Sequence, residues 1–414
     1  MAKTIHYHTD CIFFAGCENM LVNFWSSPEL RSQFDISFSY RATERYSEGL
    51  KRRAQIDFPV YPMRFLDLSD PAIVPGPWPL LAKRMVLLFL RLALTVPLLC
   101  YDVWALRRLF LRVRPDLVHI NNGGYPAALS ARSAAIAARL AGVQGVVMVV
   151  NNQAIAYSRP FRWLDYPIDL LVVQAVSRFV TASALAARQL SNILHLNEAQ
   201  CVALHNGIAV RQTTETREET RKRLGLENFQ GVIFGVVAVL RLNKGHQVLL
   251  GAMAKLLGTS PNSAFNIKVL IEGVGPLSKD LKAFVADNRL SDHCIFIGVE
   301  ENVMNFMALL DVLILPSIDY EDFPNVILEA MGMGKPVIAS RLAGIPEQIV
   351  DGETGILVEP RDVDQLAAAM ARLAMDKDLR VQMGQAGRRR FQEHFTSKVA
   401  VNNYVSLYQS LMNT

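Results

Sequence analysis

The sequence lacks any paired cysteine motif. Its 414 residues include five cysteines, an odd number, widely scattered and without a CxxC pair. This spacing argues against both a disulfide framework and a zinc site. The N-terminus also lacks a charged leader followed by a long apolar run, so we expect no secretory signal and a reducing, cytoplasmic location. The five cysteines are Cys11, Cys17, Cys100, Cys201 and Cys294.

Low-complexity tracts and repeats of a solenoid period are also missing. Hydrophobic residues make up 51% of the chain and charged residues 20%, which is the balance of a globular α/β protein and excludes disorder. The chain is too long for one comfortable core, so two domains of roughly 200 residues are expected.

The net charge of +5 is compatible with nucleic acid, an anionic lipid or an anionic small ligand. The basic residues cluster with apolar residues and not with aromatic ones, so we expect no nucleic-acid partner.

Strand-like apolar runs alternate with helical patterns along the whole chain. This alternation is typical of βαβ units, and it predicts an α/β fold with two Rossmann-like halves built on parallel sheets. The seam between the halves is predicted near residues 195–205. The predicted strands include "PDLVHI", "GVVMVV" and "FVTAS" in the first half and "GVIFGVVAV", "FNIKVLIEG", "CIFIG", "DVLILPS" and "KPVIAS" in the second.

Residues 81–115 interrupt this pattern with a long apolar run that contains Arg91 and Pro97 and is flanked by basic residues. The run is nearly long enough for a transmembrane helix. A single crossing would, however, place strands of one sheet on opposite sides of the membrane. We therefore expect a pair of basic amphipathic helices lying on an anionic leaflet, with core-covering helices as the alternative.

The stretch "EDFPNVILEAMGMGKPVIAS", residues 321–340, places two glutamates eight positions apart. The preceding "DVLILPS" reads as a buried strand, and Pro324 suits the first turn of a helix that ends near Gly334. Glu321 is thus expected at the carboxyl end of a parallel strand, and Glu329 about one and a half turns into the helix. Ligands of open α/β sheets bind at that edge.

The start of this helix would present the N–H groups of Phe323, Asn325 and Val326, which suit a phosphate. Carboxylates beside it would repel phosphate, but they are good acceptors for hydroxyl groups. A ligand with phosphate between two polyols is a nucleotide sugar.

The stretch resembles the signature of two glutamates separated by seven residues in retaining GT-B glycosyltransferases of family 4. That resemblance implies two Rossmann-like domains with parallel sheets facing across a cleft, and a hexosyltransferase activity. It implies an acceptor domain at 1–200, a donor domain at 201–391, and a C-terminal helix at 392–414 that packs back on the first domain. In the family the first glutamate contacts the donor sugar and the second the ribose. Other matching motifs are "HNGI" at 205–208, "EGVGPL" at 272–277, "DVLILPS" at 311–317 and "AGIPEQIVDGETGILVEPRDVDQLAAAM" at 343–370.

The loop "LRLNKGH", residues 240–246, resembles the family loop that holds the donor diphosphate. The resemblance gives Lys244 and Arg241 this role and groups them with Glu321 as catalytic. Val239 occupies the usual arginine place, so Arg241 lies closer to the lysine than is common. The alternative is an ordinary solvated loop charge.

Four glycine-loop residues are further donor-site candidates, together with Pro324 at the start of the helix. In "FFAGCEN", Gly16 and Cys17 stand where the family often has two glycines near the phosphates, although a plain strand-to-helix turn would look the same. In "EGVGPL", Gly273 and Gly275 are expected to let the backbone approach the nucleoside.

Asparagines are the candidates for the acceptor side. "NNGG" supplies Asn121 and Asn122, and "VNNQ" supplies Asn151 and Asn152 where many family members carry a histidine. An amide can orient a sugar hydroxyl but cannot act as a base. His119 is interpreted as a core or strand-end residue.

No metal or other cofactor is expected. "DVD" at 362–364 looks like a metal motif, but it opens a helix where Asp is simply a good cap. The resemblance implies transfer with retention from a nucleotide-sugar donor, and residues 81–115 suggest a lipid-linked or glycolipid acceptor of bacterial envelope polysaccharide or lipopolysaccharide synthesis. The enzyme would then sit peripherally on the inner face of the cytoplasmic membrane. The alternatives are a non-catalytic nucleotide-sugar-binding protein and a GT-B epimerase or phosphorylase.

Overall fold

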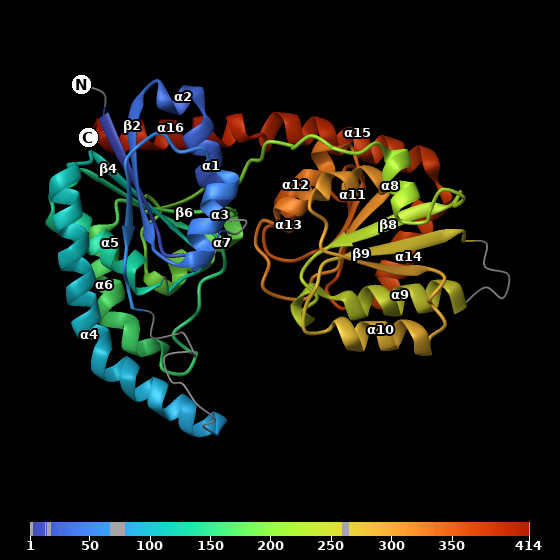
Figure 1. The fold of residues 1–414 in the computed structure, drawn as a ribbon, viewed down its shortest axis with the longest axis horizontal. Coiled ribbons are helices and arrows are strands. Elements are labelled where there is room, and N and C mark those ends of the chain that lie inside the picture. The colour runs from blue at the N-terminus through green and yellow to red at the C-terminus, as the bar shows by residue number, and fades with distance from the viewer. Residues whose placement is uncertain are drawn as a thin grey trace. The chain divides into compact units, whose positions relative to one another are not determined.

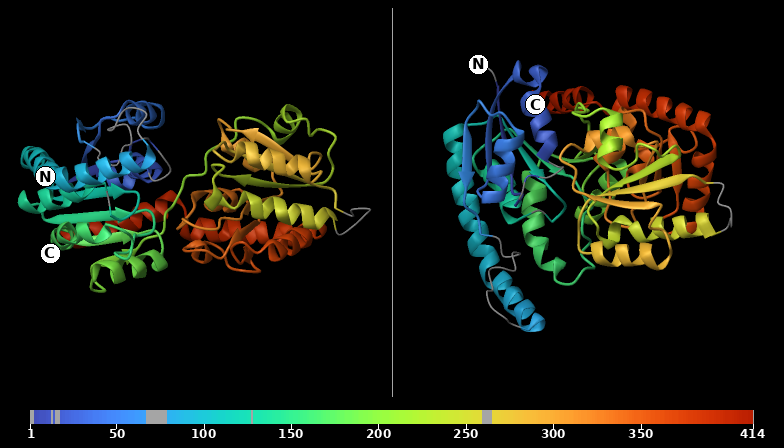
Figure 2. Two further views of the ribbon diagram at one scale, coloured as in Figure 1. Left: turned by 90° about the horizontal axis from the view of Figure 1, so that it is seen from below. Right: turned by 45° about the vertical axis from the view of Figure 1, so that its right-hand side comes forward.

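The chain folds into two compact units, each with its own sheet. Unit 1 contains residues 1–204 and 401–414, and unit 2 contains residues 205–400. Helices lie on both faces of each sheet (Figures 1 and 2). The computed structural model describes residues 3–12, 14, 18–66, 79–126, 128–258 and 265–413.

Unit 1 has a seven-stranded parallel sheet of order β3-β2-β1-β4-β5-β6-β7. Its strands are β1 (Lys3–Thr9), β2 (Phe34–Arg41), β3 (Val60–Met63), β4 (Leu117–Asn122), β5 (Gly145–Val150), β6 (Arg178–Thr181) and β7 (Cys201–Ala203). Its helices are α1 (Glu18–Ser26), α2 (Pro28–Arg31), α3 (Glu44–Arg53), α4 (Leu80–Val113), α5 (Leu129–Leu140), α6 (Tyr166–Ala175), α7 (Ala184–Leu194), the 3-10 helix η2 (Arg162–Asp165) and most of α16 (Ser397–Met412).

Successive side chains of β4 point to opposite faces of the unit 1 sheet and contact the helices that cover each face. Val118 and Ile120 face the core formed with α4, α5 and α6. His119 faces the other side, where its Nδ1 lies 2.7 Å from the hydroxyl of Tyr408 in α16. Burial lowers the pKa of His119 to about 3, so the ring is neutral. His119 is therefore a core residue.

Unit 2 has a six-stranded parallel sheet of order β10-β9-β8-β11-β12-β13. Its strands are β8 (Val232–Val237), β9 (Ile267–Glu272), β10 (Cys294–Gly298), β11 (Val312–Leu315), β12 (Val337–Ser340) and β13 (Gly355–Val358). Its helices are α8 (Arg217–Arg223), α9 (His246–Gly258), α10 (Ser278–Asp287), α11 (Val303–Leu309), α12 (Asn325–Gly332), α13 (Ile345–Gln348), α14 (Val363–Met375), α15 (Lys377–His394) and the 3-10 helix η3 (Leu242–Lys244). The predicted parallel α/β class is confirmed, since each strand quoted from the sequence lies in one of the two sheets.

The chain passes between the units twice. Within unit 2, the segment after the first passage is hydrogen-bonded to the segment before the second. The N–H of Ile208 donates to the carbonyl of Phe395, and the N–H of Ser397 donates back to Ile208, each over 3.0 Å. A Cβ on Gly207 would lie 2.3 Å from the carbonyl oxygen of Thr396. The glycine of "HNGI" is thus needed for this backbone contact.

The predicted helix pair at 81–115 is wrong. The segment forms one continuous helix, α4, with Pro97 inside it. Proline removes a single backbone hydrogen bond, and packing of the C-terminal half keeps the helix whole. The helix has the length and composition to cross a membrane from Met85 to Val113. However, β3 before it and β4 after it belong to one sheet, which excludes a crossing.

Candidate functional site

Lys244 and Glu321 form an ion pair at the carboxyl edge of the unit 2 sheet. The ammonium of Lys244, at the end of η3, binds Oε1 of Glu321 in the loop after β11. The hydroxyl of Ser317 donates to the same oxygen over 2.9 Å. Glu321 is only 6% exposed. A buried carboxylate and a half-buried ammonium are thus held together where open α/β sheets bind ligands.

Backbone contact between two loops fixes this pair. Gly245 has φ +69°, and a Cβ there would lie 1.8 Å from the carbonyl oxygen of Pro316. The N–H of Ile318 donates to the carbonyl of Asn243 over 2.8 Å. Only glycine permits so close an approach, and the approach brings Lys244 to Glu321.

Helix α12 begins beside this pair at Asn325. Pro324 is its N-cap and not part of its first turn, and it supplies no side-chain cap. The N–H groups of Asn325 and Val326 belong to the first turn, which has no intrahelical partner for them. Phe323 precedes the helix, and its buried ring stacks on His205 at 5.0 Å between centroids. The ring is thus fixed in the core, and the binding of phosphate by the N–H of Phe323 stays a prediction.

Glu329 lies further along α12, near Arg211 and within electrostatic range of Glu272. Its Oε1 is 3.9 Å from the guanidinium of Arg211. The pKa of Glu329 is raised to about 7. Burial is the main cause, Glu272 contributes to the increase, and Arg211 opposes it. This carboxyl group is thus protonated more readily than an ordinary glutamate.

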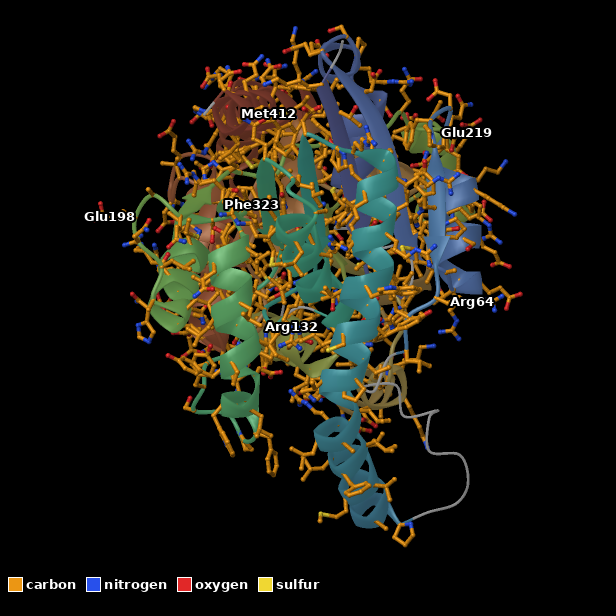
Figure 3. All side chains as sticks on the ribbon, turned by 90° about the vertical axis from the view of Figure 1, so that its left-hand side faces the viewer. Arg64, Arg132, Glu198, Glu219, Phe323 and Met412 are labelled. Atoms are coloured by element: carbon orange, nitrogen blue, oxygen red, sulfur yellow. The ribbon has the colours of Figure 1, made fainter. Side chains whose placement is uncertain are left out.

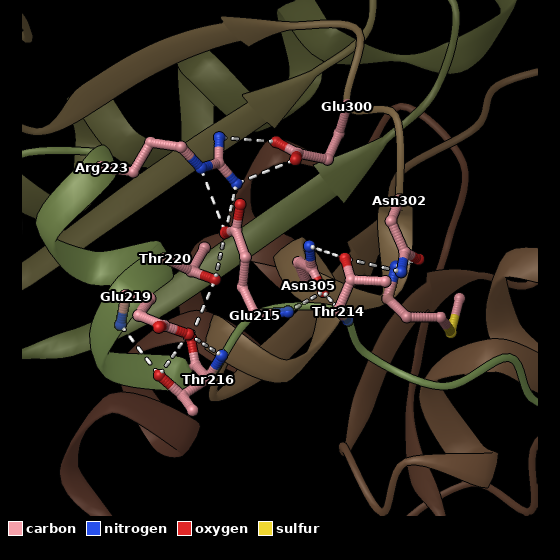
Figure 4. A network of polar contacts seen from close by, with 10 residues as sticks. Thr214, Glu215, Thr216, Glu219, Thr220, Arg223, Glu300, Asn302 and Asn305 are labelled. Atoms are coloured by element: carbon pink, nitrogen blue, oxygen red, sulfur yellow. Dashed lines mark hydrogen bonds and ion pairs between the residues drawn. The ribbon is translucent and has the colours of Figure 1, made fainter.

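The loop that follows β10 supports Glu272. The N–H of Glu300 donates to Oε1 of Glu272 over 3.0 Å. The carboxylate of Glu300 is in turn bound by Arg223 of α8 at 2.9 Å, and Arg223 also binds Glu215 (Figure 4). This network ties α8 and the chain before it to the loops at the sheet edge.

Gly273 and Gly275 are required by packing between two loops of unit 2. A Cβ on Gly273, at φ +126°, would lie 2.1 Å from the carbonyl oxygen of Ala238. A Cβ on Gly275 would lie 2.5 Å from that of Leu240. The two glycines therefore bring the loop after β9 against the loop after β8, and their approach to a nucleoside stays a prediction.

Arg241 lies in the same loop as Lys244, at the N-cap of η3. Its side chain is exposed, and so is that of Val239. Its binding of phosphate stays a prediction.

In unit 1, three of the four predicted asparagines meet at the carboxyl edge of the sheet. The amide of Asn151 donates to Oδ1 of Asn121 over 2.9 Å and to the carbonyl of Asn122 over 2.8 Å. Asn122 donates to the carbonyl of Gly124. Asn152 is exposed and lies next to them in the chain.

Glu18 is part of this edge and was missed by the sequence reasoning. Its Oε1 accepts hydrogen bonds from Asn121 at 3.0 Å and Thr9 at 2.9 Å, and its Oε2 accepts one from Tyr46 at 2.5 Å. Burial raises the pKa of Glu18 despite these bonds. An acid in the first turn of a helix that follows the first strand was the available signal. Glu18 orients the amide of Asn121, which in turn accepts from Asn151.

Two predicted donor residues, Gly16 and Cys17, lie outside the described residues. Within the described ranges, no group of three or more His, Cys, Asp or Glu side chains is arranged to hold a metal ion. Asp362 of "DVD" caps α14 by accepting from the N–H groups of Asp364 and Gln365. The interpretation of this aspartate as a helix cap is confirmed.

The whole chain shares its fold with solved glycosyltransferases. The structure of a glycosyltransferase from Rickettsia africae superposes with a TM-score of 0.77 over 99% of both chains, at 17% identity. That of Anabaena Alr3699/HepE in complex with UDP superposes with a TM-score of 0.76 over 98% of this chain and all of that one, at 17% identity. The two parallel sheets and these similarities define the GT-B fold.

The family match lies within unit 2. Residues 216–390 match the family of glycosyl transferases group 1. N-acetyl-alpha-D-glucosaminyl L-malate synthase of Bacillus anthracis is 30% identical over 194 residues, covering 47% of this chain and 49% of that protein. A GDP-mannose-dependent alpha-(1-6)-phosphatidylinositol monomannoside mannosyltransferase of Mycobacterium tuberculosis is 35% identical over 182 residues, covering 42% and 45%. The chain spans about half the length of the curated relatives it matches.

Proposed function

We propose that the chain is a retaining glycosyltransferase that moves a sugar from a nucleotide-sugar donor to a lipid-linked or glycolipid acceptor. The observation that carries the proposal is the pairing of Lys244 with Glu321 beside the uncapped start of α12. The match of residues 216–390 to the family of glycosyl transferases group 1 supports the same activity. In this proposal residues 201–391 bind the donor, and residues 1–200 with the helix of 392–414 bind the acceptor.

The donor diphosphate would lie against Lys244, Arg241 and the N–H groups at the start of α12. These groups stabilise the negative charge that develops on the leaving group, so we propose that no metal or other cofactor is needed. Glu321 accepts a hydrogen bond from the donor sugar, and Glu329 accepts from the ribose.

Retention follows if the reaction occurs on one face of the sugar. The bond between the anomeric carbon and the departing phosphate oxygen breaks, and a bond from that carbon to the acceptor oxygen forms. The acceptor proton passes to the departing phosphate. Asn121, Asn122, Asn151 and Asn152 would orient the acceptor, because an amide can hold a hydroxyl without removing its proton.

The acceptor class is proposed from the apolar, basic surface of residues 81–115, which suits a peripheral contact with the membrane. The name of one relative includes a phosphatidylinositol monomannoside acceptor, which supports a glycolipid. We place the protein on the cytoplasmic face of the cytoplasmic membrane, in the synthesis of a bacterial envelope polysaccharide or lipopolysaccharide.

The test is incubation of the purified chain with a labelled nucleotide sugar and a bacterial lipid extract, followed by NMR of the product. The proposal expects labelled sugar on a lipid, with the anomeric configuration of the donor. An inverted product would exclude retention. A donor that binds but is never consumed would identify a non-catalytic nucleotide-sugar-binding protein, and release of an altered or phosphorylated sugar would identify an epimerase or phosphorylase.

A further inference from the structure

Helix α4 is much longer than the strand that follows it. It connects the carboxyl end of β3 to the amino end of β4 in one parallel sheet. Its 34 residues span about 50 Å, whereas the six residues of β4 span about 20 Å. The C-terminal half buries Leu99, Leu106 and Phe110 in the core. The N-terminal half therefore extends past the carboxyl edge of the sheet (Figures 1 and 3). At that edge β4 ends with Asn121 and Asn122.

The outward side of α4 is apolar over most of its length. Phe89 is 69% exposed, and Met85, Leu92, Val96 and Trp104 are all more than half exposed. Isolated exposed apolar residues are ordinary, but a continuous stripe of them on one helix marks an interaction surface. The alternative that residues 81–115 cover the core is thus correct only for the inward side of the C-terminal half of α4.

A second segment, residues 155–171, continues this surface. Trp163 in η2 is 62% exposed, and Phe161, Tyr166 and Leu170 are also exposed. The guanidinium of Arg91 in α4 binds Asp165 at the end of η2 over 2.8 Å. The two segments are therefore neighbours on one side of unit 1, as Figure 3 shows. No pattern in the sequence indicated this second segment.

The exposed charges on this surface are all positive. Between residues 80 and 113 the sequence has one acid, Asp102, and it is 1% exposed. Between 155 and 171 it has Asp165 and Asp169, and both are buried in ion pairs with arginines. The arginines that remain at the surface include Arg91, Arg107, Arg108, Arg112 and Arg159.

We propose that the outward side of α4 and residues 155–171 together form one membrane-binding face that lies on an anionic bilayer. Apolar and aromatic side chains would enter the headgroup boundary, and the arginines would bind lipid phosphates. A second copy of the chain is the poorer occupant, because a twofold interface brings the same surface of both copies together and would set these arginines against each other. The bilayer is thus the partner whose charge complements the face.

The face is linked directly to the acceptor edge. Asp169 of α6 accepts hydrogen bonds from the hydroxyls of Tyr125 and Tyr157 over 2.9 and 2.7 Å. Tyr125 lies three residues after Asn122, the last residue of β4. Contact with the bilayer would therefore bring the carboxyl edge of the sheet close to a lipid-linked acceptor, a consequence that rests on the proposed function.

Vesicle flotation of the full chain tests this face. The wild type and three variants are mixed with phosphatidylcholine vesicles and with equal mixtures of phosphatidylcholine and phosphatidylglycerol. The variants are Phe89→Ser with Trp163→Ser, Arg108→Gln with Arg112→Gln, and the control Met375→Ser. Met375 is 73% exposed in unit 2, so its loss removes comparable apolar surface away from the face.

The wild type is expected to float with anionic vesicles, and the aromatic variant to lose about tenfold in partitioning for each side chain removed. The arginine variant is expected to lose about fivefold for each charge, on anionic vesicles only. The control is expected to bind like the wild type. A wild type that does not float, equal losses in the control, or a dimer that the aromatic variant abolishes would overturn the proposal. The thermal shifts that a nucleotide sugar causes are expected to be the same in the wild type and these variants. If the protein bound vesicles but no nucleotide sugar, the proposed function would be contradicted, and the membrane-binding face would still be supported.

Discussion

Among single residues, Glu329 is expected to lower the stability of the folded protein and to strengthen its binding of the nucleotide sugar. Burial raises the pKa of Glu329 from 4.5 to about 7, so the folded state binds more protons than the unfolded state between these values. Stability therefore falls as pH rises through this window. Glu329→Gln, which stays neutral, is expected to raise the free energy of unfolding at pH 8 by up to about 3 kcal/mol. Urea denaturation measures the change.

At pH 4.5 the same substitution is expected to give no gain, because the native carboxyl group is then protonated. The control is Glu227→Gln at an exposed position. A gain of equal size at both pH values would show that burial of the charge is not its cause.

Donor binding should show the opposite pH dependence. The ionised carboxylate is the better acceptor for ribose hydroxyls, so nucleotide affinity is expected to fall as pH drops below about 7. In Glu329→Gln the affinity should be low and flat with pH. Isothermal titration calorimetry at several pH values checks this, and an unchanged pH profile in the variant would rule Glu329 out as the titrating group.

The sequence predicted which residues gather at the edge of unit 2 better than it predicted their partners. Glu321 and Lys244 are 77 positions apart, and their pairing depends on the contact between two loops. Glu18 was missed because its role depends on Thr9, Tyr46 and Asn121, which come from three different elements. The spacing of residues along the chain does not predict such tertiary contacts.

Among the elements, the loop before α9 is expected to be especially intolerant of a side chain. Gly245→Ala would place a Cβ in contact with Pro316 and displace Lys244 from Glu321. Gly225 is a matched control, because its φ of +67° is close to the +69° of Gly245 and a Cβ there would meet no atom within 4 Å. Gly225→Ala should cost about 1–2 kcal/mol from its φ alone and keep donor binding.

Gly245→Ala should cost more and lose donor binding, because the backbone must also shift. Thermal unfolding with and without the nucleotide sugar distinguishes the two variants. Equal effects would show that the contact with Pro316 does not position Lys244.

Helix α4 contains a buried acid whose removal should stabilise the protein. Burial raises the pKa of Asp102 from 3.8 to about 7, with Asp10 adding to the shift and Arg41 opposing it. Stability is therefore lost as pH rises through this range. Asp102→Asn is expected to raise the free energy of unfolding at pH 8 by up to about 4 kcal/mol and to leave it unchanged below about pH 3. Chemical denaturation at the two pH values measures the change. A variant less stable than the wild type at both pH values would contradict the prediction.

The start of α12 and the continuity of α4 show where element boundaries escape sequence reasoning. Pro324 is acceptable both as an N-cap and in a first turn, and its extended ψ of 123° makes it the N-cap. Pro97 suggested a break between two helices, but packing of Leu99, Leu106 and Phe110 keeps the helix continuous. In α4 tertiary contacts thus outweigh the local signal.

At the scale of the whole molecule, periodicity was enough to predict two parallel α/β sheets. Alternating strands and helices leave few other topologies. The boundary between the units falls at Leu204 and His205, inside the seam at 195–205, and the second boundary falls between Ala400 and Val401. That second boundary lies inside α16, where the helical pattern gives no signal of a change of unit.

The central claim is that unit 2 binds and activates a nucleotide sugar through Lys244 and Glu321. The most direct measurement is thermal shift together with slow nucleotide release, using UDP-, GDP- and ADP-sugars without acceptor or added metal. The variants are Lys244→Ala and Glu321→Ala, and the control is Lys255→Ala, whose ammonium pairs with the exposed Asp364. One donor should stabilise and be slowly hydrolysed by the wild type and the control, while each site variant loses both effects, with hydrolysis falling about 10²–10³-fold. If no donor stabilised the wild type, or if the site variants responded as the control does, the account of this site would be contradicted.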